Sequence, residues 1–318
     1  MIYCYVLGRR NIYTKMHTST KYKSVANDVT SLGSVVPKQL VEDTAKALNK
    51  LKVALGGDVS GYVACRLHMN MTELNDALAA EQVDGVALAM YNIEKRAQSV
   101  IIGDQTGIGK GRQAAAMIRY GLLSGYLPVF FTDRYTLFSD MYRDCKALGI
   151  KDARPLVVNA GASVVDFDHI IEEKEKGTPD EIWSPMSEEE EDAKFEAELM
   201  QLYQKQYEVV YKAPKKNILQ GLFENGDIPS NAFDYLMITY SQLKDAKRDA
   251  TRLNFLHSLC EKYRVLFIFD EAHRSSSVSA GKVSVITQGI NQILTETTQT
   301  QCVFLSATFA KRPESLIT

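Results

Sequence analysis

From Ser99 onward, short apolar runs alternate with stretches of helical spacing, and this alternation restricts the possible folds most strongly. The apolar runs read SVIIG, PVFFT, PLVVN, DYLMIT, VLFIFD and CVFLS. Between them, segments such as RQAAAMIRYGLL and VSVITQGINQILTE place apolar residues three or four positions apart. Strands that crossover helices bury on both faces read as continuous apolar runs. We therefore predict an α/β domain with a mainly parallel sheet over residues 98–318.

The chain ahead of this domain has a different character. Residues 1–37 are polar and rich in Ser, Thr and Lys, which predicts an irregular N-terminal arm. Residues 38–97 show helical apolar spacing, as at Val41, Ala45 and Leu48, so a small helical region is expected before the sheet.

A long interruption divides the alternation at about residues 164–228, where the acid-rich segment SEEEEDAKFEAELMQLYQKQYEVVY lies. One interpretation is a solvated helical insertion, because runs of charge usually form solvated faces. The other is an acidic flap that mimics or repels nucleic acid near the cleft. The sequence leaves both interpretations open.

Composition excludes several classes of protein. A net charge of −2 over 318 residues excludes a uniformly basic nucleic-acid coat, though not a local basic groove. The five cysteines are dispersed, without a Cys-x-x-Cys pair, and predict reduced thiols instead of a disulfide frame or zinc site. No apolar run approaches the roughly 18 residues of a membrane span. We expect no membrane partner and a cytoplasmic location, or a nuclear one if the source is a eukaryote.

The stretch GDQTGIGKGRQ, residues 103–113, follows a predicted strand and opens a predicted helix. Backbone N–H groups at a helix start form an anion site, and Lys110 adds a charge for the β- and γ-phosphates. In the usual phosphate loop a Ser or Thr hydroxyl follows the lysine and sits on Mg²⁺, whereas this chain has Gly111. The alternative is a strand-to-helix turn with an exposed lysine. The candidate nucleotide-binding residues of the loop are Asp104, Gln105, Thr106, Gly107, Ile108, Gly109, Lys110, Gly111 and Arg112.

Two acids, Asp270 and Glu271, come directly after the apolar run VLFIF. Asp270 is predicted to hold Mg²⁺ through water, and Glu271 to orient or deprotonate the attacking water. A helix cap is the alternative role for this pair. Together with Lys110, the two acids are the predicted catalytic residues. A third apolar run ends in Ser306, Ala307 and Thr308.

These motifs, in this order on alternating strands, resemble the first RecA-like lobe of superfamily-2 helicases, a P-loop NTPase fold. The strawberry-notch-like helicases, which include bacterial and phage members, are more similar still. The Gly-Lys-Gly-Arg-Gln form of the loop is characteristic of them, so Gly111 is no sign of decay. The resemblance rests on EQVDGVALAMYNIEK (81–95), IIGDQTGIGKGRQAAAMIRYG (101–121), LFSDMYRDC (137–145), YLMITYSQL (235–243), FDEAHR (269–274) and SATFAKRPE (306–314).

The resemblance implies ATP and Mg²⁺ as cofactors and DNA, bound without regard to sequence, as a partner. It implies that Gln82 reads the adenine edge; the alternative is an ordinary exposed helical glutamine. His273, Ser306 and Thr308 would couple the nucleotide to the nucleic-acid surface. Candidate contacts to the nucleic-acid backbone, or else caps of the following helices, are Thr132, Arg134, Thr239 and Ser241.

The resemblance also implies a second RecA-like lobe, in trans or outside this sequence. That lobe supplies an arginine finger, worth on the order of 10³–10⁵ in rate. We therefore expect ATP hydrolysis by this chain alone to be weak. The main alternative is a non-hydrolysing P-loop scaffold that binds a protein partner through its helical N-terminal region and acidic insertion. A methyltransferase is not supported.

Overall fold

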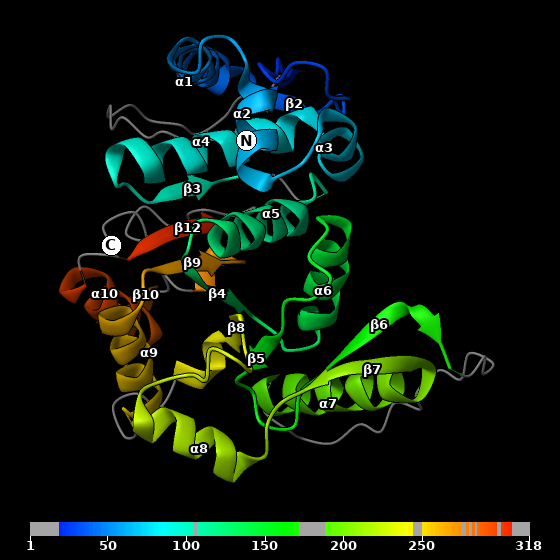
Figure 1. Cartoon of the computed structure of the whole chain (residues 1–318), viewed down its shortest axis with the longest axis vertical. Helices are drawn as coiled ribbons and strands as arrows, with labels where there is room; N and C mark the ends of the chain where they lie inside the picture. Colours follow the sequence, from blue (N-terminus) through cyan, green and yellow to red (C-terminus); the bar gives the residue numbers. More distant parts are fainter. Residues whose placement is uncertain are drawn as a thin grey trace.

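The computed structural model describes residues 19–104, 107–171, 188–243, 250–274, 278–279, 282–283, 285–297 and 300–306. Its centre is a six-stranded sheet (Figure 1). In spatial order the strands are β3 (Val100–Ile102), β12 (Gln301–Leu305), β9 (Val265–Phe269), β4 (Leu127–Thr132), β8 (Tyr235–Thr239) and β5 (Pro155–Val157). All neighbouring strands run parallel. The prediction of an α/β fold with a mainly parallel sheet is confirmed.

The two faces of the sheet are covered by different helices. Helices α5 (Lys110–Leu123) and α6 (Leu137–Ala147) share one apolar core with the N-terminal helices. Helices α8 (Lys216–Asn225), α9 (Thr251–Lys262) and α10 (Val285–Glu296) share the core on the opposite face. Successive strand residues serve the two cores alternately: Phe130 packs in the first, whereas Val129 and Phe131 pack in the second. This explains why the strands read as continuous apolar runs instead of alternating ones.

The N-terminal region packs beside α5, and it contains more regular secondary structure than the sequence predicted. Its helices are α1 (Val41–Ala54), α2 (Val59–Leu67), α3 (Met71–Ala77) and α4 (Ala80–Arg96). The predicted arm is irregular only in part, because β1 (Ser19–Lys21) and β2 (Val35–Pro37) pair in antiparallel fashion. The first 18 positions of the arm lie outside the described residues.

Two carboxylates of α4 hold the segment between β1 and β2. The buried Asp84 side chain accepts hydrogen bonds from the Tyr22 hydroxyl (2.9 Å) and from the backbone N–H of Ala26 (3.1 Å). Glu81 accepts from the backbone N–H of Leu32 (2.9 Å). Burial raises the pKa of Asp84 to about 6, although the hydrogen bonds oppose this shift. Backbone groups of the arm thus find their partners on a helix, which local propensity does not reveal.

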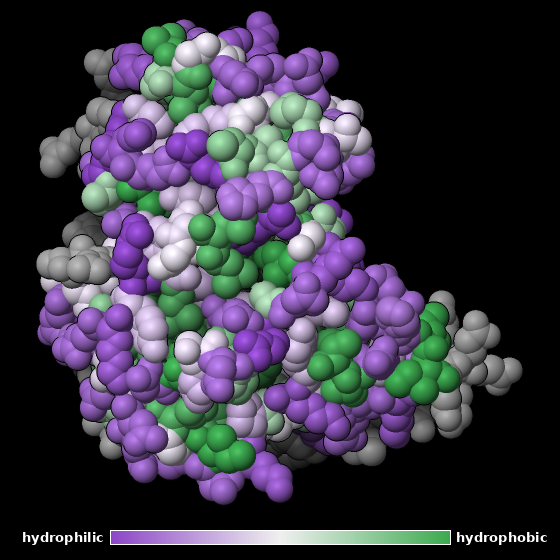
Figure 2. Space-filling model, viewed as in Figure 1, coloured by the Kyte–Doolittle hydropathy of each residue, from purple (hydrophilic) through white to green (hydrophobic). Residues whose placement is uncertain are grey.

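The insertion is not purely helical, which corrects the prediction for residues 164–228. Strands β6 (Ser163–Ile170) and β7 (Tyr207–Lys212) pair in antiparallel fashion, and α7 (Glu188–Gln206) lies between them in the sequence. Figure 1 shows β6, β7 and α7 projecting from one side of the domain. In Figure 2 apolar surface is visible among polar side chains on this projection. The exposed apolar side chains there are Ile170, Ile171, Phe195 and Leu202.

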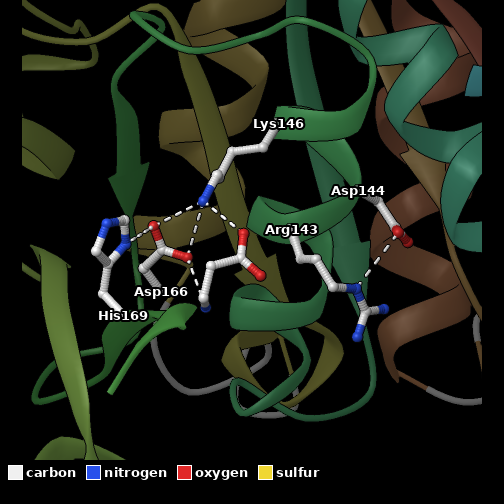
Figure 3. A network of polar contacts seen from close by, with 6 residues as sticks. Arg143, Asp144, Lys146, Asp166 and His169 are labelled. Carbon is white, nitrogen blue, oxygen red and sulfur yellow. Dashed lines mark hydrogen bonds and ion pairs between the residues drawn. The ribbon is translucent and has the colours of Figure 1, made fainter. Parts of the chain in front are cut away.

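A polar network anchors the insertion to α6 (Figure 3). Lys146 Nζ contacts both carboxylate oxygens of Asp166 (2.9 and 2.8 Å) and Oδ2 of Asp168 (2.8 Å). His169 Nδ1 also lies 2.9 Å from Asp166. Burial alone would raise the pKa of Asp166, but the hydrogen bond from Lys146 and its other polar contacts lower it overall. The start of the insertion is therefore fixed to α6 of the sheet domain by charge, while, among the described strands, β6 and β7 pair only with each other.

The remaining features of the described residues are a short strand pair, the state of the cysteines and the character of the helices. Strands β10 (Val278–Ser279) and β11 (Lys282–Val283) form a short antiparallel pair. The cysteines within the described residues, Cys65, Cys145, Cys260 and Cys302, are free thiols. Among the helices that the structure describes, none has the length and apolar character for crossing a membrane.

Candidate nucleotide site

The predicted motifs meet at one edge of the sheet. The glycine-rich loop follows β3, Asp270 follows β9, and Ser306 follows β12, which lies between those two strands. Because the three strands run parallel, their carboxyl ends share one edge, where open α/β sheets bind ligands. The backbone N–H of Ser306 donates to the carbonyl of Ile102 (3.1 Å), which ties two of these ends together. Thr308 lies outside the described residues.

Positive φ angles let the loop turn into α5. Gly107 has φ 92° and Gly109, the residue before the helix, has φ 82°. Left-handed backbone of this kind favours glycine. Lys110 opens the helix, and its Nζ donates to the carbonyl of Asp104 (3.3 Å). The structure therefore places the Lys110 ammonium at the loop, where α5 and its first backbone N–H groups begin. Gln105 and Thr106, two further predicted contacts, lie outside the described residues.

The side chain of Asp104 is buried beneath the loop, where it meets Gln113 of α5. Its Oδ2 accepts a hydrogen bond from Gln113 Nε2 (2.8 Å), and both residues are buried. A Cβ added at Gly85 of α4 would lie 3.0 Å from the same nitrogen, so α4 approaches this pair closely. The pair ties the base of the loop to α5. Sequence reasoning missed Gln113, since a glutamine in a helix carries no signal of its own.

Gln82 holds the loop itself. Its Nε2 donates to the carbonyls of Ile108 (2.7 Å) and Gly109 (3.2 Å), and its Oε1 accepts from the N–H of Ala79 (2.8 Å). Gln82 is only 6% exposed, so the interpretation as an exposed helical glutamine is wrong. Contact with adenine stays a prediction, and it requires Nε2 to give up at least one of these carbonyls.

Asp270 lies partly buried at the end of β9. Thr132 Oγ1 donates to its Oδ2 (3.4 Å), and the hydroxyl of Tyr240 donates to its carbonyl (2.7 Å). Burial raises the pKa of Asp270 to about 6, and the charge of Glu271 adds to this effect while Lys110 opposes it. A cation at this carboxylate would favour its charged form.

Glu271 has an unusual backbone for a residue with a side chain, with φ 47°. Such left-handed backbone costs energy outside glycine and often marks functional positions. Its Oε2 lies 3.2 Å from Nδ1 of His273, which in turn lies 3.3 Å from Oγ of Ser306. These contacts connect the ends of β9 and β12 through side chains.

Gly111 faces a carboxylate of the neighbouring helix. A Cβ added to Gly111 would overlap Oδ2 of Asp144 in α6. Asp144 also accepts from Nε of Arg112 (3.0 Å), and a guanidinium N–H of Arg112 donates to the carbonyl of Ala77 (3.3 Å). The Arg112 side chain is therefore directed to α6 and α3, although it was predicted to bind ATP.

The predicted nucleic-acid contacts fall into two groups. Thr132 and Thr239 are buried, and Thr239 exchanges hydrogen bonds with Asn159 (2.7 and 3.1 Å). Ser241 is exposed, and Arg134 pairs with Asp192 of α7 (3.1 Å). The two threonine side chains therefore lie in the interior, whereas Arg134 and Ser241 reach the surface.

The chain matches a family model described as P-loop containing NTP hydrolase pore-1 over residues 37–317. No curated protein matches the chain. The family match agrees with the glycine-rich loop at the carboxyl edge of a parallel sheet. It covers nearly the whole chain, the N-terminal helices included. The chain therefore belongs to the P-loop containing NTP hydrolase pore-1 family.

Proposed function

We propose that this chain is the ATP-binding lobe of an ATP-dependent DNA helicase or translocase that works with a second RecA-like lobe. The observation that carries the proposal is the meeting of three motif ends at one edge of the sheet. The glycine-rich loop, the acids Asp270 and Glu271, and Ser306 come together there from β3, β9 and β12. The resemblance to strawberry-notch-like helicases supports the finer assignment.

The residues at this edge suit nucleotide hydrolysis. The N–H groups at the start of α5 and the Lys110 ammonium would bind the β- and γ-phosphates of ATP. Asp270 fits Mg²⁺, a hard cation that binds through one or two carboxylates together with phosphate oxygens and water. When bound, Mg²⁺ neutralises charge that develops on the transferred phosphoryl group. Its charge would also relieve the repulsion that Glu271 imposes on Asp270.

Glu271 is the candidate for orienting or deprotonating the attacking water. Its strained backbone and its contact with His273 fix the carboxylate, because the imidazole lies 3.2 Å from Oε2. Since His273 also reaches Ser306 (3.3 Å), a change at Glu271 on hydrolysis has a short route to the strand end of β12. This contact chain is our candidate for coupling the nucleotide to the nucleic-acid surface.

DNA contact is proposed for Arg134 and Ser241 and no longer for the buried threonine side chains. Arginine and hydroxyl groups bind phosphates without reading bases. Two acids of α7 occupy this region: Asp192 pairs with Arg134, and Glu196 accepts from the N–H of Thr136 (3.1 Å) at the start of α6. These contacts favour the acidic-flap interpretation, in which carboxylates of the insertion stand where DNA phosphates would bind.

A titration with a fluorescent ATP analogue, with and without Mg²⁺, tests the nucleotide site. We expect saturable binding that is lost in Lys110→Ala and becomes insensitive to Mg²⁺ in Asp270→Ala, while Lys151→Ala, an exposed lysine, serves as the control. DNA-stimulated hydrolysis after addition of a second RecA-like lobe tests the helicase assignment. Absence of nucleotide binding would instead favour the scaffold, whose partner binding should survive Lys110→Ala.

A further inference from the structure

The structure gives a steric explanation for the glycine that follows Lys110. Phosphate loops usually carry Ser or Thr at that position. Here a Cβ on Gly111 would overlap Oδ2 of Asp144 and would lie 3.4 Å from its Cγ. The carboxylate from α6 thus fills the space into which a side chain at position 111 would extend.

Asp144 cannot leave this space easily. It is 8% exposed and lies within α6, which packs against α5. Its Oδ1 accepts from Nε of Arg112 (3.0 Å). Nε of Arg143 lies 3.7 Å from the same oxygen, as Figure 3 shows. Arg112 is itself held at the carbonyl of Ala77 (3.3 Å) at the end of α3. Moving the carboxylate would break this charge-assisted contact and leave a nearly buried charge without its partner.

We propose that Asp144 is a positioning residue of the nucleotide site: its carboxylate replaces the missing side chain of residue 111 and holds the first turn of α5 through Arg112. The inference rests on the proposed nucleotide site. That turn carries Lys110 and the N–H groups that would bind phosphate, so its displacement changes nucleotide affinity. Gly111 and Asp144 therefore form one steric unit, in which a larger residue at one position requires a smaller one at the other.

The test is a double-mutant cycle on Gly111→Ser and Asp144→Ala, measured by affinity for a fluorescent ATP analogue and by thermal unfolding without nucleotide. We expect Gly111→Ser to overpack the site and weaken binding by about tenfold or more. Asp144→Ala alone should weaken it as well, because Arg112 loses its partner. The double variant should lose no more affinity than Asp144→Ala alone, since the serine enters the space that Asp144 leaves and Arg112 lacks its partner in both variants. If Gly111→Ser alone fails to fold, recovery of folding in the double variant supports the proposal equally.

Two results would overturn it. One is wild-type affinity and stability in Gly111→Ser; the other is a double variant whose losses equal the sum of the single losses. Asp140→Ala is the matched control, because Asp140 also lies on α6 and pairs with an arginine, Arg143 (2.9 Å), yet touches no loop residue in the contacts described above. If the wild type binds no nucleotide, the proposed function fails. Thermal unfolding of the single and double variants then tests by itself whether residues 111 and 144 are coupled.

Discussion

The contact of Gln82 with the glycine-rich loop leads to a prediction with a calculable size. The substitution Gln82→Glu keeps the acceptor for the Ala79 N–H and replaces the Nε2 donor by an oxygen. Two hydrogen bonds, to the carbonyls of Ile108 (2.7 Å) and Gly109 (3.2 Å), are lost. At a net value of about 1 kcal/mol each, the loop loses about 2 kcal/mol, and repulsion between the new oxygen and the two carbonyls adds to this. If the loop must keep this shape to bind phosphate, nucleotide affinity falls roughly 30-fold.

The assay compares ATP and GTP by competition against a fluorescent nucleotide. A loop-holding role predicts equal losses for both nucleotides, because the phosphates are identical. Gln98→Glu, the same substitution at an exposed position just beyond α4, should leave both affinities unchanged. A loss confined to ATP would refute this reasoning in favour of direct adenine contact. Unchanged affinity for both would show that the loop needs no support from Gln82.

Three further predictions concern charge. The pKa of Asp270 is raised from 3.8 to about 6, so the folded protein binds the proton more tightly than the unfolded chain and stability falls as pH rises between these values. Asp270→Asn should therefore raise the free energy of unfolding at pH 7 by up to about 3 kcal/mol. Denaturation in urea at a series of pH values should show that this gain disappears below about pH 4. Asp192→Ala should raise affinity for single-stranded DNA up to about fivefold in low-salt anisotropy titrations, and Arg134→Ala should lower it; DNA binding unaffected by either change would argue against the acidic flap. Lys146→Met should destabilise the chain by about 1–3 kcal/mol in chemical denaturation, because Asp166 is 6% exposed and would lose its cation; an unchanged midpoint would contradict an anchoring role.

The sheet could be predicted from the sequence because its strands are defined by local composition. Runs such as VLFIF are apolar throughout, and a strand buried on both faces requires such a run. The acids after β9 and the loop after β3 each follow such a run, and carboxyl ends of parallel strands share one edge.

The parts that escaped prediction depend on contacts between distant segments. Asp144 lies 33 residues beyond Gly111 (144 − 111), and its sequence neighbours suggest only ordinary helical ion pairs. The burial of Gln82 depends on how α4 is rotated against the loop, which periodicity leaves undetermined. The pairing of β1 with β2 depends on carboxylates of α4 that accept from the segment between them. Each of these features is set by tertiary packing, not by local propensity.

The first turn of α4 has a consequence for which changes of chain length the protein can tolerate. Glu81 and Asp84 hold the segment between β1 and β2, while Gln82, between them, holds the loop before α5. One residue inserted or deleted just after Asp84 rotates this turn by about 100° against the rest of α4, so the change would turn all three side chains away from their partners together. Single substitutions there remove one contact at a time. Gain or loss of a single codon just after this turn would instead release the N-terminal segment and the glycine-rich loop in one step.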